Sequence, residues 1–390
     1  MMKKILKNFF VSGVAGGALL MFSALAALLT VNFGGADFYQ KIFLTNLPLQ
    51  LAEILQVREF TLRDWINDAL MALFFLLVGL ELKKEAIIGD LSTKSKLMVP
   101  SIAALGGVIV PALIFYFITK AEPQHFPGIA IPCATDIAFA YGIICLFGER
   151  ISKSAKIFLI ALAVIDDLIA IVIIAIFYSH NINLASLAFG AFVTFLLWYL
   201  SRQKVNKISP YLLLGAALWL AFLRAGIHPA IAGVAVGAFI PLKIGNENFL
   251  EKFANKLSPF VNFLILPLFA FANAGVTSQY LSLNAILESS LALGIIVGLF
   301  LGKQLGVFLF SFLAIRAGVI SLPRGVNWMQ FYAIAMLTGI GFTMSLFIGA
   351  LGFANSSFLF NYAKSAVLIG SALSAIGGSA LLALALRLKR

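Results

Sequence analysis

The chain has 390 residues, of which 62% are hydrophobic and only 11% are charged. A soluble domain carries roughly 25% charged residues, so this composition excludes an ordinary soluble fold and favours the bilayer as solvent. The net charge is +12, but the basic residues lie in turns between apolar runs and form no stripe, which argues against a nucleic-acid partner. The two cysteines, Cys133 and Cys145, share one apolar run and predict neither a disulfide framework nor a metal centre.

Apolar runs separated by short polar turns predict an all-α, polytopic membrane protein with about twelve transmembrane helices. The predicted spans are 11–31, 59–83, 96–118, 126–147, 156–178, 184–201, 208–223, 227–241, 250–274, 287–314, 327–350 and 360–386. The start of the chain resembles a cleavable signal peptide, but its apolar run continues to about Leu29, which favours a retained first helix. The connection 32–58 fits either short strands or an interfacial helix.

The basic residues are divided unequally between the two sides that alternating turns define. One side holds 21 of the 28: Lys3, Lys4, Lys7, Lys83, Lys84, Lys94, Lys96, Arg150, Lys153, Lys156, Arg202, Lys204, Lys207, Lys243, Lys252, Lys256, Arg316, Arg324, Arg387, Lys389 and Arg390. The other side holds six: Lys41, Arg58, Arg63, Lys120, Arg224 and Lys364. The positive-inside rule makes the first side cytoplasmic. We therefore expect a multi-pass membrane protein with both termini in the cytoplasm.

Four charged residues lie near the centres of predicted spans. Most of the sixteen acids are in turns or at helix ends, but Asp136, Asp166 and Asp167 are not, and Lys303 is the one base placed mid-span. Each such charge costs roughly 2.5–3.5 kcal/mol at the centre of a spanning helix. A self-satisfied salt bridge would explain one Asp–Lys pair, but three acids against one base leave at least two carboxyl groups that need protons or cations.

The adjacent pair Asp166 and Asp167 points in two directions, about 100° apart on a helix. One side chain can face a cavity while the other faces a neighbouring helix. Two desolvated carboxyl groups near each other repel, so the pair favours exchange of a proton for a cation. Hard oxygen ligands suit Na⁺ or Li⁺, and no soft ligand set accompanies them.

Two spans carry helix-breaking residues near their centres. Pro132 and Thr135 stand directly before Asp136, and two glycines interrupt the segment 338–343. Each could be a simple kink, but the two breaks fall in the fourth and eleventh spans, the middle members of two triplets. This pattern predicts inverted repeats, at about 96–178 and 287–386, within a single transmembrane transporter domain, 1–390. The exposed helix ends would carry partial charges that can bind or balance ions.

Glycines recur every fourth residue in one predicted span. Gly294, Gly298, Gly302 and Gly306 place a smooth stripe on one helix face, which predicts close helix packing. The pairs Gly13/Gly17 and Gly233/Gly237 have the same interpretation.

Several motifs then resemble one known family. They are 67–72 (NDALMA) through Glu81, 134–140 (ATDIAFA), 165–168 (IDDL), 228–233 (HPAIAG), 266–275 (LPLFAFANAG), 302–303 (GK) and 338–345 (TGIGFTMS). They occur in order over most of the chain and resemble the NhaA family of Na⁺/H⁺ antiporters, which is itself a reference case for inverted repeats. The resemblance implies an antiporter fold in which the interrupted spans 4 and 11 cross.

The resemblance also implies roles for individual residues. Asp167 would be the main carboxylate for cation and proton, so that Asp166 and Asp167 together hold the transported Na⁺. Asp166 would pair with Lys303 and exchange partners during transport. Asp136 would balance the half-helix ends at the crossing, and Thr135 would help the site.

A second group of residues would serve access and regulation. The resemblance implies that Glu81, Lys84 and Glu85 line the cytoplasmic entrance and tune the response to pH, and that His228 lies near the external side in a position linked to pH dependence. It further implies electrogenic, pH-regulated exchange of cytoplasmic Na⁺ or Li⁺ for external H⁺, with no cofactor. The expected partners are these ions, membrane lipid and a second copy in a homodimer.

Rival functions fit the sequence less well. An intramembrane aspartyl protease needs its second acid in a Gly-x-Gly-Asp context, and neither Asp136 nor Asp166 has one, so we expect no enzyme. A sodium-coupled organic-solute symporter of the bile-acid type shares crossed broken helices, but it would keep polar sodium ligands rather than a tandem Asp pair with a buried Lys. A channel would need a continuous polar pore, and these spans are too apolar.

Overall fold

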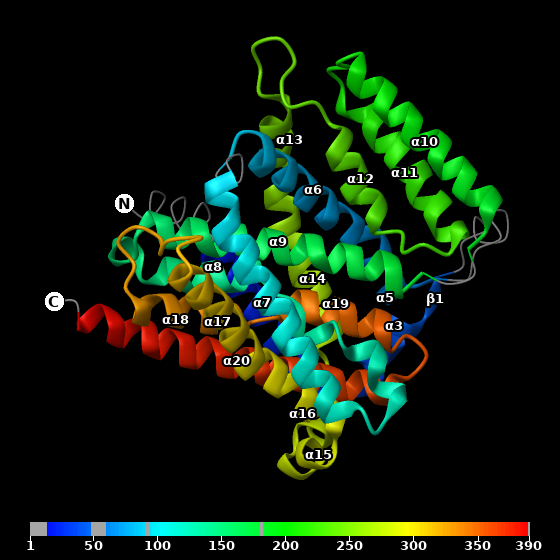
Figure 1. Cartoon of the computed structure of the whole chain (residues 1–390). Helices are drawn as coiled ribbons and strands as arrows, with labels where there is room; N and C mark the ends of the chain where they lie inside the picture. Colours follow the sequence, from blue (N-terminus) through cyan, green and yellow to red (C-terminus); the bar gives the residue numbers. More distant parts are fainter. Residues whose placement is uncertain (1–13, 48–59, 90–93, 180–181, 389–390) are drawn as a thin grey trace, which may run out of the picture. The chain divides into compact units, whose positions relative to one another are not determined.

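The computed structural model describes residues 14–47, 60–89, 94–179 and 182–388 (Figure 1). The chain forms two compact units. The first consists of Met1–Asn32, Asp90–Ala170 and Asn273–Arg390, and the second of Phe33–Gly89 and Ile171–Ala272. The division falls inside two helices, α9 and α14.

Helices are the only regular elements in the described part of the first unit. Its elements are α2 (Val14–Asn32), α7 (Lys94–Thr119), η3 (Pro123–Gly128), η4 (Ile131–Cys133), α8 (Ile137–Leu146), η5 (Gly148–Arg150), α9 (Lys153–Phe177), η7 (Ser278–Leu281), α15 (Leu283–Glu288), α16 (Ser290–Val297), η8 (Gly298–Gly302), α17 (Lys303–Arg316), α18 (Trp328–Leu337), α19 (Phe342–Gly352) and α20 (Ser357–Arg387). The π-helical turn η8 joins α16 directly to α17, so that Lys303 begins α17 inside one continuous span.

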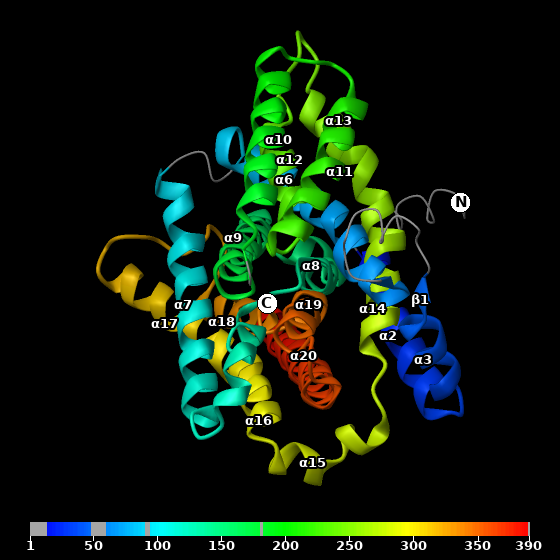
Figure 2. The same ribbon diagram turned by 90° about the vertical axis from the view of Figure 1, so that its right-hand side faces the viewer.

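Glycines bring helices of this unit into close contact. Both views show α7 beside α17 (Figure 2). A Cβ atom on Gly306 would collide with the backbone of Gly106, and one on Gly302 would lie 2.8 Å from Cα of Pro111. The predicted stripe is thus a close-packing face, as small residues in membrane helices allow.

Two spans of the first unit are broken where the sequence carries Pro, Thr and Gly. Before α8, residues 134–136 leave the helical conformation, with ψ of 151° at Ala134 and 102° at Asp136. Between α18 and α19 the chain turns at residues 338–341, and the two helices are bent by 40°. The breaks meet, because the Asp136 N–H donates a 2.7 Å hydrogen bond to the Ile340 carbonyl.

The second unit contains helices and a minimal antiparallel sheet. Its elements are α3 (Ala36–Leu44), β1 (Asn46–Leu47), β2 (Phe60–Thr61), α5 (Leu62–Asp64), η1 (Trp65–Leu70), α6 (Met71–Ile87), α10 (Leu184–Arg202), α11 (Ile208–Ala225), α12 (Ile231–Phe239), α13 (Phe249–Phe260), η6 (Val261–Ile265) and α14 (Leu266–Ala274). Asn46 pairs with Thr61, and Leu47 with Phe60. The connection 32–58 therefore includes both a short helix and a strand, and residues 48–59 lie outside the described residues.

Small residues also set the packing of α6 against α12. A Cβ on Gly233 would collide with the Ala72 carbonyl, and one on Gly237 would lie 2.9 Å from the backbone of Gly79. Around this contact, apolar side chains that include Leu80 form a buried core between α6, α10, α11, α12 and α13. The prediction for Gly233/Gly237 is confirmed. A Cβ on Gly17 would lie 3.3 Å from the Ala138 carbonyl, and Gly13 lies outside the described residues.

Ten helices of the described residues are long and apolar enough to cross a membrane, or eleven if the bent pair α18–α19 counts as one span. This establishes a multi-pass membrane protein. The predicted span 227–241 differs most, because its helix α12 has only nine residues. Nine residues rise about 13 Å, less than half of the roughly 30 Å hydrocarbon core.

Candidate functional site

Four of the predicted site residues lie buried where the two broken spans meet. Asp136 and Asp166 are each 2% exposed, and Thr135 and Lys303 are fully buried. Asp136 and Thr135 come from the break before α8, Asp166 from the middle of α9, and Lys303 from the start of α17. Elements far apart in the sequence thus bring four of the predicted site residues together.

Asp136 caps two helices with one carboxylate. Its Oδ1 accepts a 3.0 Å hydrogen bond from the Phe139 N–H in the first turn of α8. Its Oδ2 accepts from the N–H and the Oγ1 hydroxyl of Thr343, at 3.0 and 2.6 Å, at the start of α19. Helix N-termini carry partial positive charge, so a carboxylate in this position is stabilised as the anion. The sequence predicts a helix break at 338–343, but it does not identify Thr343 as a hydrogen-bond partner of Asp136.

Lys303 and Asp166 form a buried ion pair. The Lys303 Nζ lies 2.6 Å from Asp166 Oδ2, and neither side chain is exposed to solvent. The Nζ also donates to the Cys133 carbonyl at the end of η4. A Cβ on Gly107 would lie 2.9 Å from Val307 Cγ2 and 3.4 Å from Nζ, so this glycine avoids a clash with Val307 beside the ion pair. Neither the Cys133 carbonyl nor Gly107 was identified from the sequence, because a carbonyl and a missing side chain leave no chemical signature in it.

Thr135 connects the ion pair to the second break. Its Oγ1 lies 2.8 Å from Asp166 Oδ2 and 2.8 Å from the Thr338 carbonyl. A hydroxyl has one proton, and a carbonyl can only accept. An ionised Asp166 therefore competes with Thr338 for that proton, whereas a protonated Asp166 can donate to Thr135 and leave the hydroxyl proton for Thr338. The hydrogen bonding of Thr135 thus depends on the protonation of Asp166.

Asp167 is the next residue of α9 and is 1% exposed. It points about 100° around the helix from Asp166. A further buried base, Lys364 in α20, was expected in a turn but is 3% exposed. Its Nζ lies 3.3 Å from the Gly275 carbonyl and 4.5 Å from the centroid of the Phe360 ring. The described part of the first unit thus buries three aspartates and two lysines, so buried carboxyl groups outnumber buried ammonium groups.

The remaining predicted site residues belong to the second unit. Glu81, Lys84 and Glu85 lie within two turns of α6 and are half-buried. Lys84 forms a 2.8 Å ion pair with Glu251 of α13. These positions are spaced i, i+3 and i+4, so they share one face of the helix.

His228 lies directly before α12 and contacts a buried acid that was expected at a helix end. Its Nε2 is 3.5 Å from Asp68 Oδ1, and both side chains are 9% exposed. Asp68 sits in the π-helical turn η1, and its carbonyl accepts a 3.0 Å hydrogen bond from the Trp219 indole. The motif that contains Asp68 indicates the family but not the burial of this residue, because Asp68 stands only six positions after the start of the span at Leu62.

Helices long enough to span a bilayer, with ionisable side chains buried where two of them break, define a polytopic membrane protein with a charged site inside its transmembrane region. The chain belongs to the Na⁺/H⁺ antiporter 1 family, whose family model matches residues 7–382. It is 46% identical to the Na(+)/H(+) antiporter NhaA of Yersinia enterocolitica, over 100% of the chain and 99% of that relative. It is 44% identical to the proteins of the same name from Vibrio alginolyticus, over 98% and 97%, and from Vibrio cholerae, over 100% of both chains. The resemblance that the motifs indicated is confirmed.

Proposed function

We propose that this protein exchanges cytoplasmic Na⁺ or Li⁺ for external H⁺ across the bacterial inner membrane. The observation that carries the proposal is the buried Lys303–Asp166 pair with Asp167 beside it, at a place where acids exceed bases. An excess of buried carboxylates binds protons or hard cations to stay neutral. The relatives are named for sodium–proton antiport, and their similarity covers the whole chain.

Competition for the carboxylates provides the exchange. We assign the main cation and proton site to Asp167, with Asp166 as the second carboxylate of the transported Na⁺. When Asp166 takes up a proton or cation, its attraction for the Lys303 Nζ falls, and Thr135 shifts its proton toward Thr338. Because both ions use the same carboxylates, binding of one displaces the other, and the two access states alternate around the site. Two acids in tandem favour more than one proton per Na⁺, and hence electrogenic exchange.

Asp136 provides a fixed negative charge at the point where the two broken spans cross. It satisfies the N-terminal ends of α8 and α19, while Lys303 and Thr135 meet carbonyls at the ends of η4 and α18. The partial positive charges of the helix N-termini are thus matched by a carboxylate, and the partial negative charges of the carbonyls are matched by hydrogen-bond donors. This arrangement supports the antiporter fold with interrupted, crossing spans 4 and 11.

Two inverted repeats within about twelve spans fit the packing of the first unit. In such a pair, equivalent helices meet at the symmetry axis. Here the third-span helix α7 contacts the tenth-span helix α17 at Gly106 and Gly306, and the break before α8 contacts the break after α18. We propose that the repeats occupy about 96–178 and 287–386 of one transporter domain.

Access and pH response are assigned to the second unit. We propose that Glu81, Lys84 and Glu85 line the cytoplasmic entrance, where acids gather cations, and that His228 contributes to pH dependence from the external side. The excess of basic residues in one set of turns supports cytoplasmic termini. A homodimer completes the proposed assembly.

Proton movement in proteoliposomes tests the exchange. We would add Na⁺, Li⁺ or K⁺ to vesicles that carry a proton gradient and a pH-sensitive dye, with wild type, Asp167→Asn, and Glu247→Gln as the matched control. Glu247 is an exposed acid paired with Lys252 in a turn, so its loss should leave transport unchanged. We expect Na⁺ and Li⁺, but not K⁺, to dissipate the gradient in wild type and in Glu247→Gln, and Asp167→Asn to be silent.

The opposite results have definite meanings. Wild type without cation-driven proton flux from about pH 6 to pH 9 would refute the antiport function, and sodium-driven uptake of an organic solute would then support symport. An active Asp167→Asn protein would refute the assignment of the main carboxylate and leave the exchange itself intact.

A further inference from the structure

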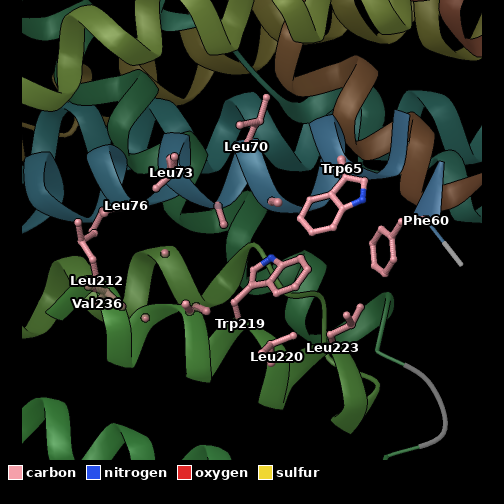
Figure 3. A pocket seen from close by; sticks show the side chains of 16 residues that line it. Phe60, Trp65, Leu70, Leu73, Leu76, Leu212, Trp219, Leu220, Leu223 and Val236 are labelled. Atoms are coloured by element: carbon pink, nitrogen blue, oxygen red, sulfur yellow. The ribbon is translucent and has the colours of Figure 1, made fainter. Parts of the chain in front are cut away.

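An apolar groove in the second unit is not used by the proposed transport site. It has a volume of about 620 Å³ and lies between the η1–α6 span and the helices α11 and α12 (Figure 3). Leu76, Leu212 and Val236 line one end, and Phe60 and Trp65 line the other. Alanines and glycines between them keep the groove open.

The described residues that line the groove offer hydrocarbon and almost no polar group. The Trp219 indole N–H is already occupied by its 3.0 Å hydrogen bond to the Asp68 carbonyl, so the ring presents its apolar surface. The ring stacks against Trp65 at 6.1 Å between centroids and 19° between planes. Packed proteins do not keep voids of this size, and an apolar cavity does not retain water. On helices that span a bilayer, the available filler is therefore hydrocarbon.

The length of the groove matches one leaflet. Its η1–α6 wall runs from Trp65 to Leu76, a rise of eleven residue steps that corresponds to about 16 Å. One leaflet contributes about half of the roughly 30 Å hydrocarbon core. The tryptophans stand at the end nearest the start of the span at Leu62, the interfacial depth at which Trp side chains are enriched.

A basic residue lies on the groove-lining face of α11, at this same end of the groove. Ala216 and Leu220 of α11 line the groove at i, i+4 spacing, and the next residue in that series is Arg224, which is exposed in the last turn of α11. Residues at this spacing share a helix face. An arginine guanidinium is suited to bind a phosphate through paired hydrogen bonds.

We propose that this groove binds one acyl chain of a phospholipid, with the lipid phosphate at Arg224. On the proposed orientation, the lipid belongs to the external leaflet. None of the described residues that line the groove belongs to the buried charged site of the first unit.

Tryptophan quenching tests the proposal directly, because two of the four tryptophans line the groove. In a Trp198→Phe/Trp328→Phe background, the delipidated protein in detergent is titrated with phosphatidylglycerol brominated on its acyl chains. We expect quenching that saturates at one lipid per chain and is reversed by the unbrominated lipid. Ala216→Phe fills the groove and should abolish it, whereas Leu213→Phe, on the same helix but 72% exposed and outside the groove, should retain it. Arg224→Gln should weaken binding about tenfold.

Three results would overturn the proposal. Quenching that rises without saturation would mean ordinary contact with bulk lipid. Saturable quenching that is equal in wild type, Ala216→Phe and Arg224→Gln would place the lipid elsewhere. Loss of dimer mass in Ala216→Phe by light scattering, with quenching unchanged, would assign the groove to a second copy. Arg224→Gln alters an exposed side chain, so it remains informative if Ala216→Phe does not fold.

Discussion

Each unit contains a lysine–carboxylate pair, and the two pairs differ in burial far more than in geometry. In the first unit, Lys303 and Asp166 lie 2.6 Å apart with no exposed surface. In the second, Lys84 and Glu251 lie 2.8 Å apart with side chains 36% and 40% exposed. Nearly equal distances therefore belong to very different dielectric surroundings.

This difference shows that the distance between the charged atoms does not by itself determine how an ion pair contributes to stability or responds to a proton or cation. An exposed pair exchanges good hydration for a modest attraction, so it contributes about 0–1 kcal/mol and weakens with salt. A buried pair has already lost its water, so each partner depends on the other. Such a pair adds little net stability but responds strongly when a proton or cation reaches one member. This is the property that ion exchange needs.

Breaking the buried pair should have the largest effect. Asp166→Asn leaves the Lys303 ammonium without its carboxylate, and we expect a loss of about 3–5 kcal/mol of stability. Thermal unfolding in detergent, followed by circular dichroism, measures it. Asp166→Asn/Lys303→Met removes both charges and should recover most of the loss. A single variant as stable as wild type would show that water or another group already compensates Lys303.

Asp136 differs from the acids of both ion pairs, because it is buried and its hydrogen-bond donors are uncharged. Asp136→Asn keeps the shape but loses the negative charge at the ends of α8 and α19, and we expect a loss of about 2–3 kcal/mol. Replacing a lysine in addition to Asp136 should not restore the lost stability, since no described lysine pairs with Asp136. Rescue by Lys303→Met, measured by the same unfolding assay, would mean that Asp136 and Lys303 are one electrostatic unit.

Thr343→Val tests the single hydroxyl bond to Asp136, with a 2.6 Å donor removed at nearly constant volume. We expect a loss of about 1.5 kcal/mol, because the Thr343 N–H still donates. Thr343→Ser keeps the donor and is the matched control. In the double variant with Asp136→Asn, the two losses should fall short of additivity by about 1 kcal/mol. Strict additivity would contradict the shared bond.

Much of the fold was predictable because a bilayer simplifies the pattern. Long apolar runs such as 156–178 and 360–386 correspond to α9 and α20, since a span must satisfy its backbone within one helix. The short helix α12 was not predictable from hydropathy, because 227–241 is apolar apart from His228 while only nine residues of it are α-helical. Tertiary contact with α6 at Gly233 and Gly237, rather than composition, allows the short segment to be buried.

The charged residues of the site could be predicted from the sequence, but the groups that they contact could not. Asp136, Asp166 and Lys303 were identifiable because charge inside an apolar run is costly. Asp68 and Lys364 were missed as buried groups, since both stand within eight residues of a helix start, where a charge ordinarily reaches water. Thr343 and the Cys133 carbonyl were identified only once the breaks were seen to meet.

The smallest effect is expected at the exposed pair, and it decides whether burial is the right explanation. Lys84→Gln removes the charge that faces Glu251, and we expect a loss below about 1 kcal/mol that vanishes in about 1 M salt. Lys252→Gln, which breaks the more exposed 2.9 Å pair with Glu247, should behave in the same way and is the matched control. Unfolding of both variants at low and high salt measures the difference. A loss of several kcal/mol at Lys84 that persists in salt would show that this pair resembles the buried one. The contrast between the two units would then rest on something other than solvent, such as the packing of α6 against α13.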